Sequence, residues 1–403
     1  MKFTVPALLG ATIGFLAWPH AIWLAPVALL LLSVVNRSHW LGPFLLMLGY
    51  HLATTWGLIH GTAVFFPQAG TELGLAFWSL SSLAFALPYL AYPYLVLYFR
   101  GGGFGAVVAT LVTSSVSTIL PPLGIVGWTS PWIGALPLGW FGIVLILWTI
   151  FWVNQNPWGD EWARWSVVIE FWVLFALSAW LSVWLGIFPS PLRTLPRPPA
   201  GWVGIDTRLG HLSSTESYVE ASMDLVPKVL ADLRAGDRLV LLPETVAGPW
   251  LPGTRAVWRP VIRWTRRHPG QTVLLGAAVP HGSGYLDALV QIADGRQTIL
   301  PDHIPVPFSM WHPWRRHGNF RMAPFSRKPE STEIDHRKAG YLICYEQLLM
   351  WPALDLYPQG IQVLLAPAND WWARGTDIPA IQRASAKAWA AFFGVPVIFA
   401  VNR

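Results

Sequence analysis

The sequence predicts a chain in two parts, a multi-span α-helical membrane domain followed by a layered α/β domain. Of the 403 residues, 54% are hydrophobic and only 12% are charged, whereas a soluble domain averages about 25% charged residues. Such a chain has too little polar surface to be soluble throughout, so a large part of it must lie in lipid. The charged residues also gather in the second half. Before residue 191 they are only Lys2, Arg37, Glu72, Arg100, Asp160, Glu161, Arg164 and Glu170.

Long apolar runs in the first half predict about seven membrane crossings, because a helix needs about 20 residues to cross the hydrocarbon core. The first two runs are short, and they fit either two tilted crossings or a re-entrant hairpin. We therefore expect a transmembrane domain over residues 1–188. Its apolar runs are 3–18, 21–35, 40–58, 72–98, 104–121, 138–153 and 166–188.

The basic residues of this half predict its orientation. With the N-terminus in the cytoplasm, the inner segments hold Lys2, Arg37, Arg100 and Arg164, and the opposite loops hold no lysine or arginine. Cytoplasmic loops of membrane proteins carry an excess of these residues. Seven crossings then bring the chain outside near residue 189, and one miscounted span would reverse this placement. We therefore expect a multi-pass protein of the bacterial inner membrane whose C-terminal domain is periplasmic.

A proline-rich linker over 189–200 separates the two halves. Beyond it, β-favouring runs alternate with amphipathic helical segments, which predicts a layered α/β domain over 201–403. Pro227 predicts a kink or a restart in the first long helix. The expected strands are 203–205, 237–244, 272–279, 286–293, 297–300, 340–344, 363–366 and 395–401, and the expected helices are 217–235, 258–267, 348–356 and 380–393.

The only cysteine of the chain, Cys344, ends the apolar run that starts at Gly340. Open α/β folds place their chemistry at the carboxyl ends of strands, so this thiol is either a small packing residue or a nucleophile. Glu244 ends another predicted strand and brings a carboxylate to the same kind of edge. A lone cysteine allows no internal disulfide and gives no zinc signature, so no metal and no cofactor are expected.

Three short motifs follow one another in the second half: Leu-Leu-Pro-Glu244, Ile-Cys344-Tyr-Glu346 and Ala-Asn369-Asp370-Trp371-Trp372. Together they resemble the landmarks of the nitrilase, or carbon–nitrogen hydrolase, superfamily. The membrane half and the segments 306–308 and 325–327 narrow the resemblance to the apolipoprotein N-acyltransferase branch. Among its members, the chain is most similar to conjugal transfer proteins encoded on rhizobial and agrobacterial plasmids. The resemblance covers nearly the whole chain, and it implies an α-β-β-α sandwich for the second half.

The resemblance implies a role for each of these residues. Glu244 is the base, Cys344 the nucleophile, and Glu346 orients the site or the incoming amine, while Asn369 and Trp371 bind the substrate. Enzymes of this branch move an acyl group from a phospholipid to the amino group of a lipoprotein. The implied partners are membrane lipids, a lipoprotein or other amine acceptor, and proteins of the conjugation apparatus. No nucleic-acid contact is expected, because nothing in the chain alternates aromatic and basic residues.

One departure from the family pattern bears directly on activity. Asp302 stands where the family has a lysine that stabilises the oxyanion, and losing one such donor costs about 10²–10³ in rate. Three outcomes remain open: His303, or Arg315 with Arg316, supplies the positive charge; the site performs a slower or different acyl transfer; or the domain only binds. The chain is then either a cysteine-dependent acyltransferase or amidase, or a scaffold of the conjugation apparatus.

Tryptophans gather near these motifs, at Trp311, Trp314, Trp371 and Trp372. They have two interpretations, ordinary packing or a lid that faces the bilayer. Tryptophan is enriched at membrane–water interfaces, so we favour the lid.

Overall fold

The computed structural model describes residues 3–155, 195–312, 314–315, 317–322 and 331–403. Backbone contacts divide the chain into two compact units. The first consists of Met1–Leu58 and Leu75–Leu195, and the second of Ile59–Gly74 and Pro196–Arg403. The segment 59–74, which its position in the sequence assigns to the membrane half, therefore packs with the second unit. Half of the expected linker 189–200, residues 189–194, lies outside the described residues.

The first unit is built from helices joined by short turns. In one helix pair, α1 (Thr4–Ala17) packs against α3 (Gly42–Thr54) so closely that a Cβ added at Gly10 would collide with the Leu46 carbonyl. Small residues at helix contacts allow this approach, which is typical of helix pairs in membranes. The remaining elements are η1 (Ile22–Leu24), α2 (Val27–Ser38), α5 (Gly70–Ala86), η2 (Leu87–Ala91), α6 (Tyr92–Tyr98), α7 (Gly102–Thr118), η3 (Leu123–Ile125), η4 (Pro131–Leu138) and α8 (Gly139–Gln155).

Two helical stretches of the described residues are long and apolar enough to cross a membrane. They are Gly70–Tyr98, with 29 residues, and Pro131–Gln155, with 25. The apolar runs 3–18 and 21–35 form helices that are too short for this, and Pro19 and Pro26 lie where these helices are interrupted. The prediction of about seven crossings is therefore not confirmed, and the expected span 166–188 lies outside the described residues.

The second unit contains two β-sheets. The first has the order β1-β2-β3-β4-β5, with parallel pairs from β1 to β3 and antiparallel pairs from β3 to β5. The second has the order β6-β7-β8-β9, with one antiparallel pair followed by two parallel pairs. The strands are β1 (Trp202–Gly204), β2 (Leu239–Leu241), β3 (Thr272–His281), β4 (Gly284–Ala293), β5 (Arg296–Pro301), β6 (Ser331–Ile334), β7 (Arg337–Tyr341), β8 (Val363–Asn369) and β9 (Val397–Asn402).

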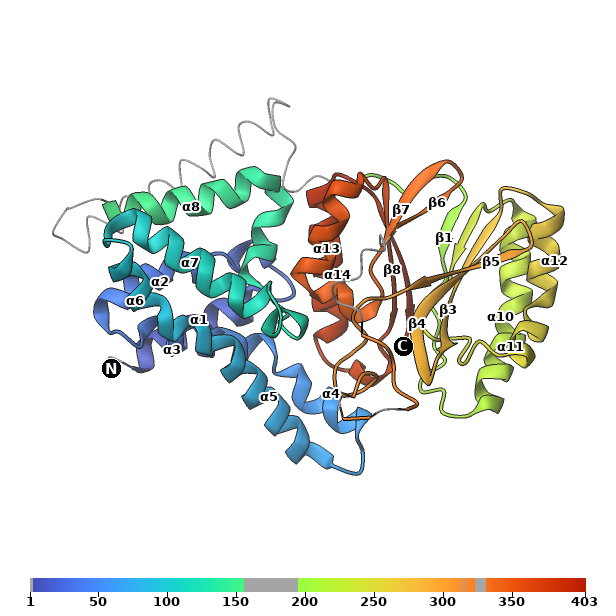
Figure 1. The fold of residues 1–403 in the computed structure, drawn as a ribbon, viewed down its shortest axis with the longest axis horizontal. Coiled ribbons are helices and arrows are strands. Elements are labelled where there is room, and N and C mark those ends of the chain that lie inside the picture. Colours follow the sequence, from blue (N-terminus) through green and yellow to red (C-terminus); the bar gives the residue numbers. More distant parts are fainter. Residues whose placement is uncertain (1–2, 156–194, 313, 316, 323–330) are drawn as a thin grey trace. The chain divides into compact units, whose positions relative to one another are not determined.

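The two sheets pack face to face, and helices cover their outer faces. Leu274 and Leu289 of the first sheet share one buried core with Leu365 and Ala400 of the second. Figure 1 shows α10 and α12 against the five-stranded sheet, and α13 and α14 against the four-stranded one. The helices of this unit are α4 (Gly57–Phe65), α10 (Thr215–Ala235), α11 (Pro252–Val257), α12 (Arg259–Arg267), α13 (Met350–Leu356) and α14 (Ile378–Phe393). This arrangement is the α-β-β-α sandwich expected for the second half.

Two elements of this unit differ from their predicted form. Helix α10 continues through Pro227 without a restart, because its buried face, which includes Val226 and Val229, is held by packing against the sheet. Strand β2 ends at Leu241 instead of reaching Glu244. Leu242 still donates to the Leu274 carbonyl at 2.8 Å, but the next residue is a proline, which has no N–H to continue the ladder.

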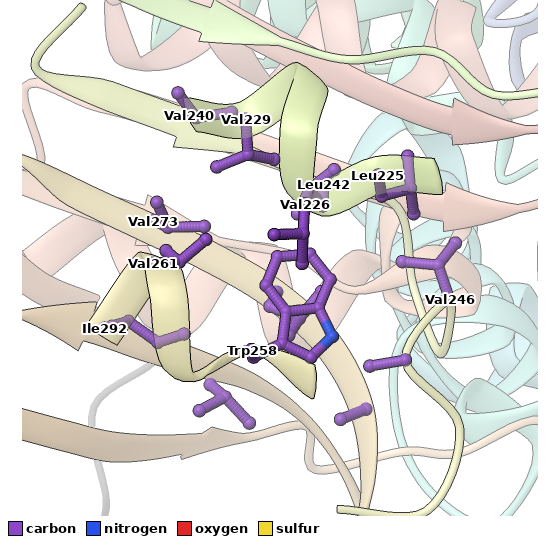
Figure 2. Packing of buried hydrophobic residues seen from close by; sticks show 14 of the residues in the cluster. Leu225, Val226, Val229, Val240, Leu242, Val246, Trp258, Val261, Val273 and Ile292 are labelled. Carbon is purple, nitrogen blue, oxygen red and sulfur yellow. The ribbon is translucent and has the colours of Figure 1, made fainter. Parts of the chain in front are cut away.

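The core between the outer helices and the five-stranded sheet is centred on Trp258. Its indole is fully buried, and Figure 2 shows it among Val226, Leu242 and Val261. Because α10, α12 and the sheet all contribute to this cluster, the packing around Trp258 fixes the helical layer on the sheet.

We expect Trp258→Ala to lower the free energy of unfolding by about 3–5 kcal/mol, the usual cost of emptying an aromatic site in a core. Trp314→Ala is the matched control, because Trp314 is 63% exposed and its removal should cost less than about 1 kcal/mol. Urea unfolding of the full chain in detergent, followed by circular dichroism, measures both. Equal costs would contradict the packing described above.

Candidate active site

Cys344 does not end a strand, contrary to the sequence prediction, because β7 ends at Tyr341 and Cys344 lies at a sharp bend three residues later. Leu342 still pairs with the second sheet, since its N–H donates to the Leu365 carbonyl at 3.0 Å. Cys344 then opens the 3₁₀ turn η5 (Cys344–Leu348) at φ +44°, a backbone that persists in non-glycine residues only where the surroundings impose it. Gln347 does so, because its Nε2 donates to the carbonyls of Leu342 at 3.1 Å and Pro367 at 2.8 Å. The bend thus holds the thiol at the sheet edge.

Glu346 is fully buried, and its carboxylate accepts three backbone N–H groups. Oε2 accepts from Ile343 at 3.0 Å, while Oε1 accepts from His303 at 2.8 Å and from Ile304 at 3.3 Å. Hydrogen bonds with an ionised acceptor are roughly twice as strong as neutral ones. Glu346 therefore positions the loop that follows β5 against the bend that carries Cys344.

Glu244 and Cys344 meet through their side chains. Glu244 is buried, with 4% of the residue exposed, and its carboxyl group lies beside the Cys344 thiol, the Asp287 carboxyl group and the Asn369 backbone N–H. Burial raises the pKa of Glu244 to about 7, and the nearby Asp370 charge adds to the rise, while these three neighbours oppose it. At neutral pH a large fraction of Glu244 is therefore ionised and within hydrogen-bond reach of the thiol proton, which is the geometry of a general base.

Asp287 belongs to this site, although the sequence motifs did not include it. It lies on β4, opposite Ala278 of β3, and it is 1% exposed. Burial raises the pKa of Asp287 well above its usual range, and the neighbouring Glu244 raises it further. The sequence signal was a lone carboxylate inside the apolar run 285–290, on the same strand face as Leu289 in the core between the sheets.

The loop after β5 brings Asp302 and His303 into the same buried region. Asp302 is 3% exposed, and its backbone N–H donates to the Asp287 carbonyl at 2.8 Å. His303 is equally buried and is held through its backbone by Glu346. Of the two arginines considered as substitutes for the family lysine, Arg315 is exposed and Arg316 lies outside the described residues.

The electrostatics of the site oppose a preformed thiolate. Burial raises the pKa of the Cys344 thiol well above its ordinary value, and the charges of Glu244 and Asp370 raise it further; the Asn369 N–H acts in the opposite direction. Cysteines with a depressed pKa lie next to cations or helix N-termini. Cys344, whose pKa is raised, is not a cysteine of this kind. A thiol with a raised pKa becomes nucleophilic only when a base takes its proton during attack.

Asn369 ends β8 and Asp370 follows it, and both join the site to neighbouring elements. The Asn369 side chain donates to the Thr245 hydroxyl at 2.9 Å and accepts from Asn402 Nδ2 at 2.8 Å. Burial raises the pKa of Asp370 to about 7, and Arg403 and Arg383 moderate the shift. Asn369 therefore acts here as a clamp between the strand ends, with its backbone N–H directed at both Glu244 and Cys344.

The Trp371 side chain lies in an aromatic stack. It is sandwiched by His211, with ring centroids 4.0 Å apart, and by Phe65 of α4 at 5.7 Å. Trp372 contacts the same helix, since a Cβ at Gly61 would lie 2.7 Å from its ring. These two tryptophans thus pack within the second unit, whereas Trp314 is largely exposed, as a residue of a lid would be.

The structure therefore gathers Glu244, Asp287 and Cys344 by side-chain contact, and Asp302, Glu346 and Asn369 through backbone hydrogen bonds. The described residues contain no group of three or more His, Cys, Asp and Glu side chains arranged to hold a metal ion.

Two curated proteins align with the chain over nearly its whole length. It is 31% identical over 409 residues to the conjugal transfer protein TraB of Agrobacterium fabrum, covering 98% of this chain and 91% of that protein. It is 30% identical over 408 residues to the probable conjugal transfer protein TraB of Sinorhizobium fredii, covering 99% and 97%. The chain belongs to the TraB family of conjugal transfer proteins. This confirms the resemblance to conjugal transfer proteins found in the sequence; no broader family model matches.

Solved structures similar to the chain come from the nitrilase superfamily. An amidase of that superfamily from Nesterenkonia is 15% identical and covers 52% of this chain and 78% of its own, with a TM-score of 0.35. A CN-hydrolase superfamily protein from Xanthomonas campestris is 15% identical and covers 42% and 63%, with a TM-score of 0.28.

We expect alkylation of Cys344 by iodoacetamide to become faster as the pH rises through about 7, because Glu244, whose pKa is about 7, takes the thiol proton only when ionised. Glu244→Gln should remove this rise and slow the reaction at pH 8 by about 10²-fold. Mass spectrometry of the intact chain follows the label, since Cys344 is the only cysteine.

Asp294→Asn is the control for this experiment, because Asp294 is an exposed residue of the turn between β4 and β5. Its pH profile should match that of the wild type. A wild-type rate that rises only above pH 8 to 9, as for an isolated thiol, would contradict the base role of Glu244.

Proposed function

We propose that this TraB-family chain is a membrane-bound acyltransferase or amidase that supports conjugal plasmid transfer. The observation that carries the proposal is the buried contact between the Glu244 carboxyl group and the Cys344 thiol, at a bend where Cys344 has φ +44°. A nucleophile paired with a buried base at such an edge supports acyl transfer through a covalent intermediate. Membership of a conjugal transfer family supports a role for that chemistry in plasmid transfer.

The proposed reaction begins when Glu244 takes the proton of the Cys344 thiol as the sulfur attacks an acyl carbonyl. A C–S bond forms, and the carbonyl π electrons move to oxygen to give a tetrahedral oxyanion. When the oxyanion collapses, the leaving alcohol or amine takes the proton from Glu244, and a thioester remains on Cys344. An amine acceptor then attacks the thioester, its proton returns through Glu244, and the thiol is restored.

The site suits a slow reaction. A carboxyl group at Asp302 replaces the lysine that the family resemblance implies, and one lost oxyanion donor costs about 10²–10³ in rate. The buried charges of Glu244 and Asp370 also disfavour negative charge on sulfur. These observations favour the second candidate function, a scaffold of the conjugation apparatus whose pocket no longer turns over. In either case the implied partners are membrane lipids, a lipoprotein or other amine acceptor, and conjugation proteins.

The proposal includes an inner-membrane location with the sandwich in the periplasm. Gly70–Tyr98 and Pro131–Gln155 support membrane insertion by their length and composition. With the predicted seven crossings, a cytoplasmic N-terminus puts Lys2, Arg37, Arg100 and Arg164 on the inner side, and this distribution supports the orientation.

We expect Cys344→Ala and Glu244→Gln each to lower plasmid transfer by about 10²-fold or more, because each removes one partner of the proton transfer. Transfer frequency between donor and recipient cells measures the effect, with protein levels checked by immunoblotting and Asp294→Asn as the control. Unchanged transfer by Cys344→Ala at a normal protein level would leave only the scaffold function.

A topology experiment tests the location separately. We expect alkaline phosphatase fused after Pro199 to be active, because this enzyme folds only in the oxidising periplasm, whereas a fusion after Arg100 should be silent. The reverse pattern would place the sandwich in the cytoplasm and overturn the periplasmic assignment without affecting the chemistry.

A further inference from the structure

Two carboxyl groups face each other beside the thiol, and the strand between them has the residues that let them meet. On β3, Gly276 and Ala278 lie on the face that turns toward the second sheet, in register with Leu289 and Asp287 of β4. Gly276 also lies directly against the backbone of Glu244, where a Cβ would approach the Glu244 Cα to 2.5 Å. With only a hydrogen and a methyl group on that face of β3, the Glu244 side chain can reach across the strand to Asp287.

The Glu244 and Asp287 carboxyl groups lie side by side in the buried site, and two adjacent carboxyl groups away from water cannot both be ionised, so one of them holds a proton. The surroundings decide which group holds it. Glu244 lies beside the Cys344 thiol and the Asn369 N–H, and both of these donors favour its ionised form. Asp287 is 1% exposed, its Oδ1 has no hydrogen-bond partner among the described residues, and its remaining support is the Ala288 N–H. The better-supported anion is Glu244.

We propose that Asp287 stays protonated at neutral pH and donates its carboxyl proton to Glu244, which makes it the positioning residue that keeps the base ionised and directed at Cys344. This inference rests on the proposed function only in taking Glu244 as the base. A neutral acid in this position supplies the hydrogen bond that a cation could give. It adds no further negative charge to a site that already holds the carboxyl groups of Asp302 and Asp370.

The groups that could alter this balance come from every element packed around the pair. They are Cys344 of η5, Asp370 after β8 and Tyr218 of α10, together with the loop that carries Asp302. The Tyr218 pKa is raised by burial and then by the Glu244 charge, so the phenol stays neutral. Asp370 is the one member of this set that titrates near the same pH, and the experiment therefore includes a variant that removes its charge.

Infrared spectroscopy of the full chain in detergent tests the proton directly. At pH 7 the wild type should show the carbonyl stretch of a protonated carboxylic acid, and Asp287→Asn should lose that contribution. Asp370→Asn should keep the Asp287 contribution, and Asp294→Asn should leave the protonated-acid band unchanged. If the Asp287→Asn difference spectrum contains only carboxylate bands, Asp287 is ionised and the proposal is wrong.

The pH profile of Cys344 alkylation tests the positioning role. Asp287→Ala removes a donor from a buried carboxylate, so the midpoint of the rise should move up by about one to two pH units. Asp287→Asn still offers an N–H donor and should return the midpoint to within about half a unit of the wild type. A purely structural role would lower both rates without this difference, so equal midpoints in the wild type and Asp287→Ala, or equal shifts in the two variants, would overturn the proposal.

These outcomes are separate from those of the proposed function. If Cys344→Ala transfers the plasmid normally, acyl transfer is excluded as the function, but the infrared assignment of Asp287 still holds. Conversely, an ionised Asp287 removes the positioning role while the Glu244–Cys344 pair stays intact.

Discussion

The site depends on the hydrogen bonds that the Glu346 carboxyl group accepts from three backbone N–H groups. These N–H groups belong to Ile343, at the end of the second sheet, and to His303 and Ile304, in the loop that leaves the first sheet. One buried anion therefore joins the two sheets at the edge where Cys344 lies. Without it, three N–H groups would be buried with no acceptor, at a cost of about 1–3 kcal/mol each. The left-handed bend at Cys344 can be maintained because this clamp and Gln347 hold both of its sides.

That clamp adds a further carboxyl group to a site that already holds several. Glu244, Asp287, Asp302 and Asp370 are all buried nearby, and the Cys344 pKa is raised rather than lowered. A site of this kind keeps its thiol protonated at rest and allows attack only with simultaneous proton transfer. The same feature bears on both candidate functions. An inert scaffold has no need of a carboxyl group beside the sulfur, while an efficient acyltransferase would benefit from a cation there.

Much of the sandwich could be predicted from the sequence, because the strands near 272–279, 286–293 and 395–401 have buried apolar patterns that no other element explains. The partnership of Glu244 and Cys344 was also predictable, since both follow strands whose ends meet at one edge. Asp287 was not, because within an apolar strand run a single aspartate does not show which residue it faces. The packing of 59–74 against Trp371 and Trp372 could not be predicted either. Hydropathy indicates that a helix is shielded from water, but not which surface it packs against. The number of membrane crossings depends on where Pro19 and Pro26 interrupt the apolar runs, which composition alone does not determine.

The position of α4 has a consequence for how the chain is made. Phe65 and Gly61 cover Trp371 and Trp372, so a segment synthesised early completes a surface that leaves the ribosome only near the end of translation. Until then α4 lacks the aromatic rings that it packs against. A fragment that begins at Pro196 would expose both indoles to water and would tend to self-associate. The second unit is therefore made of two stretches of the chain that are synthesised at different times.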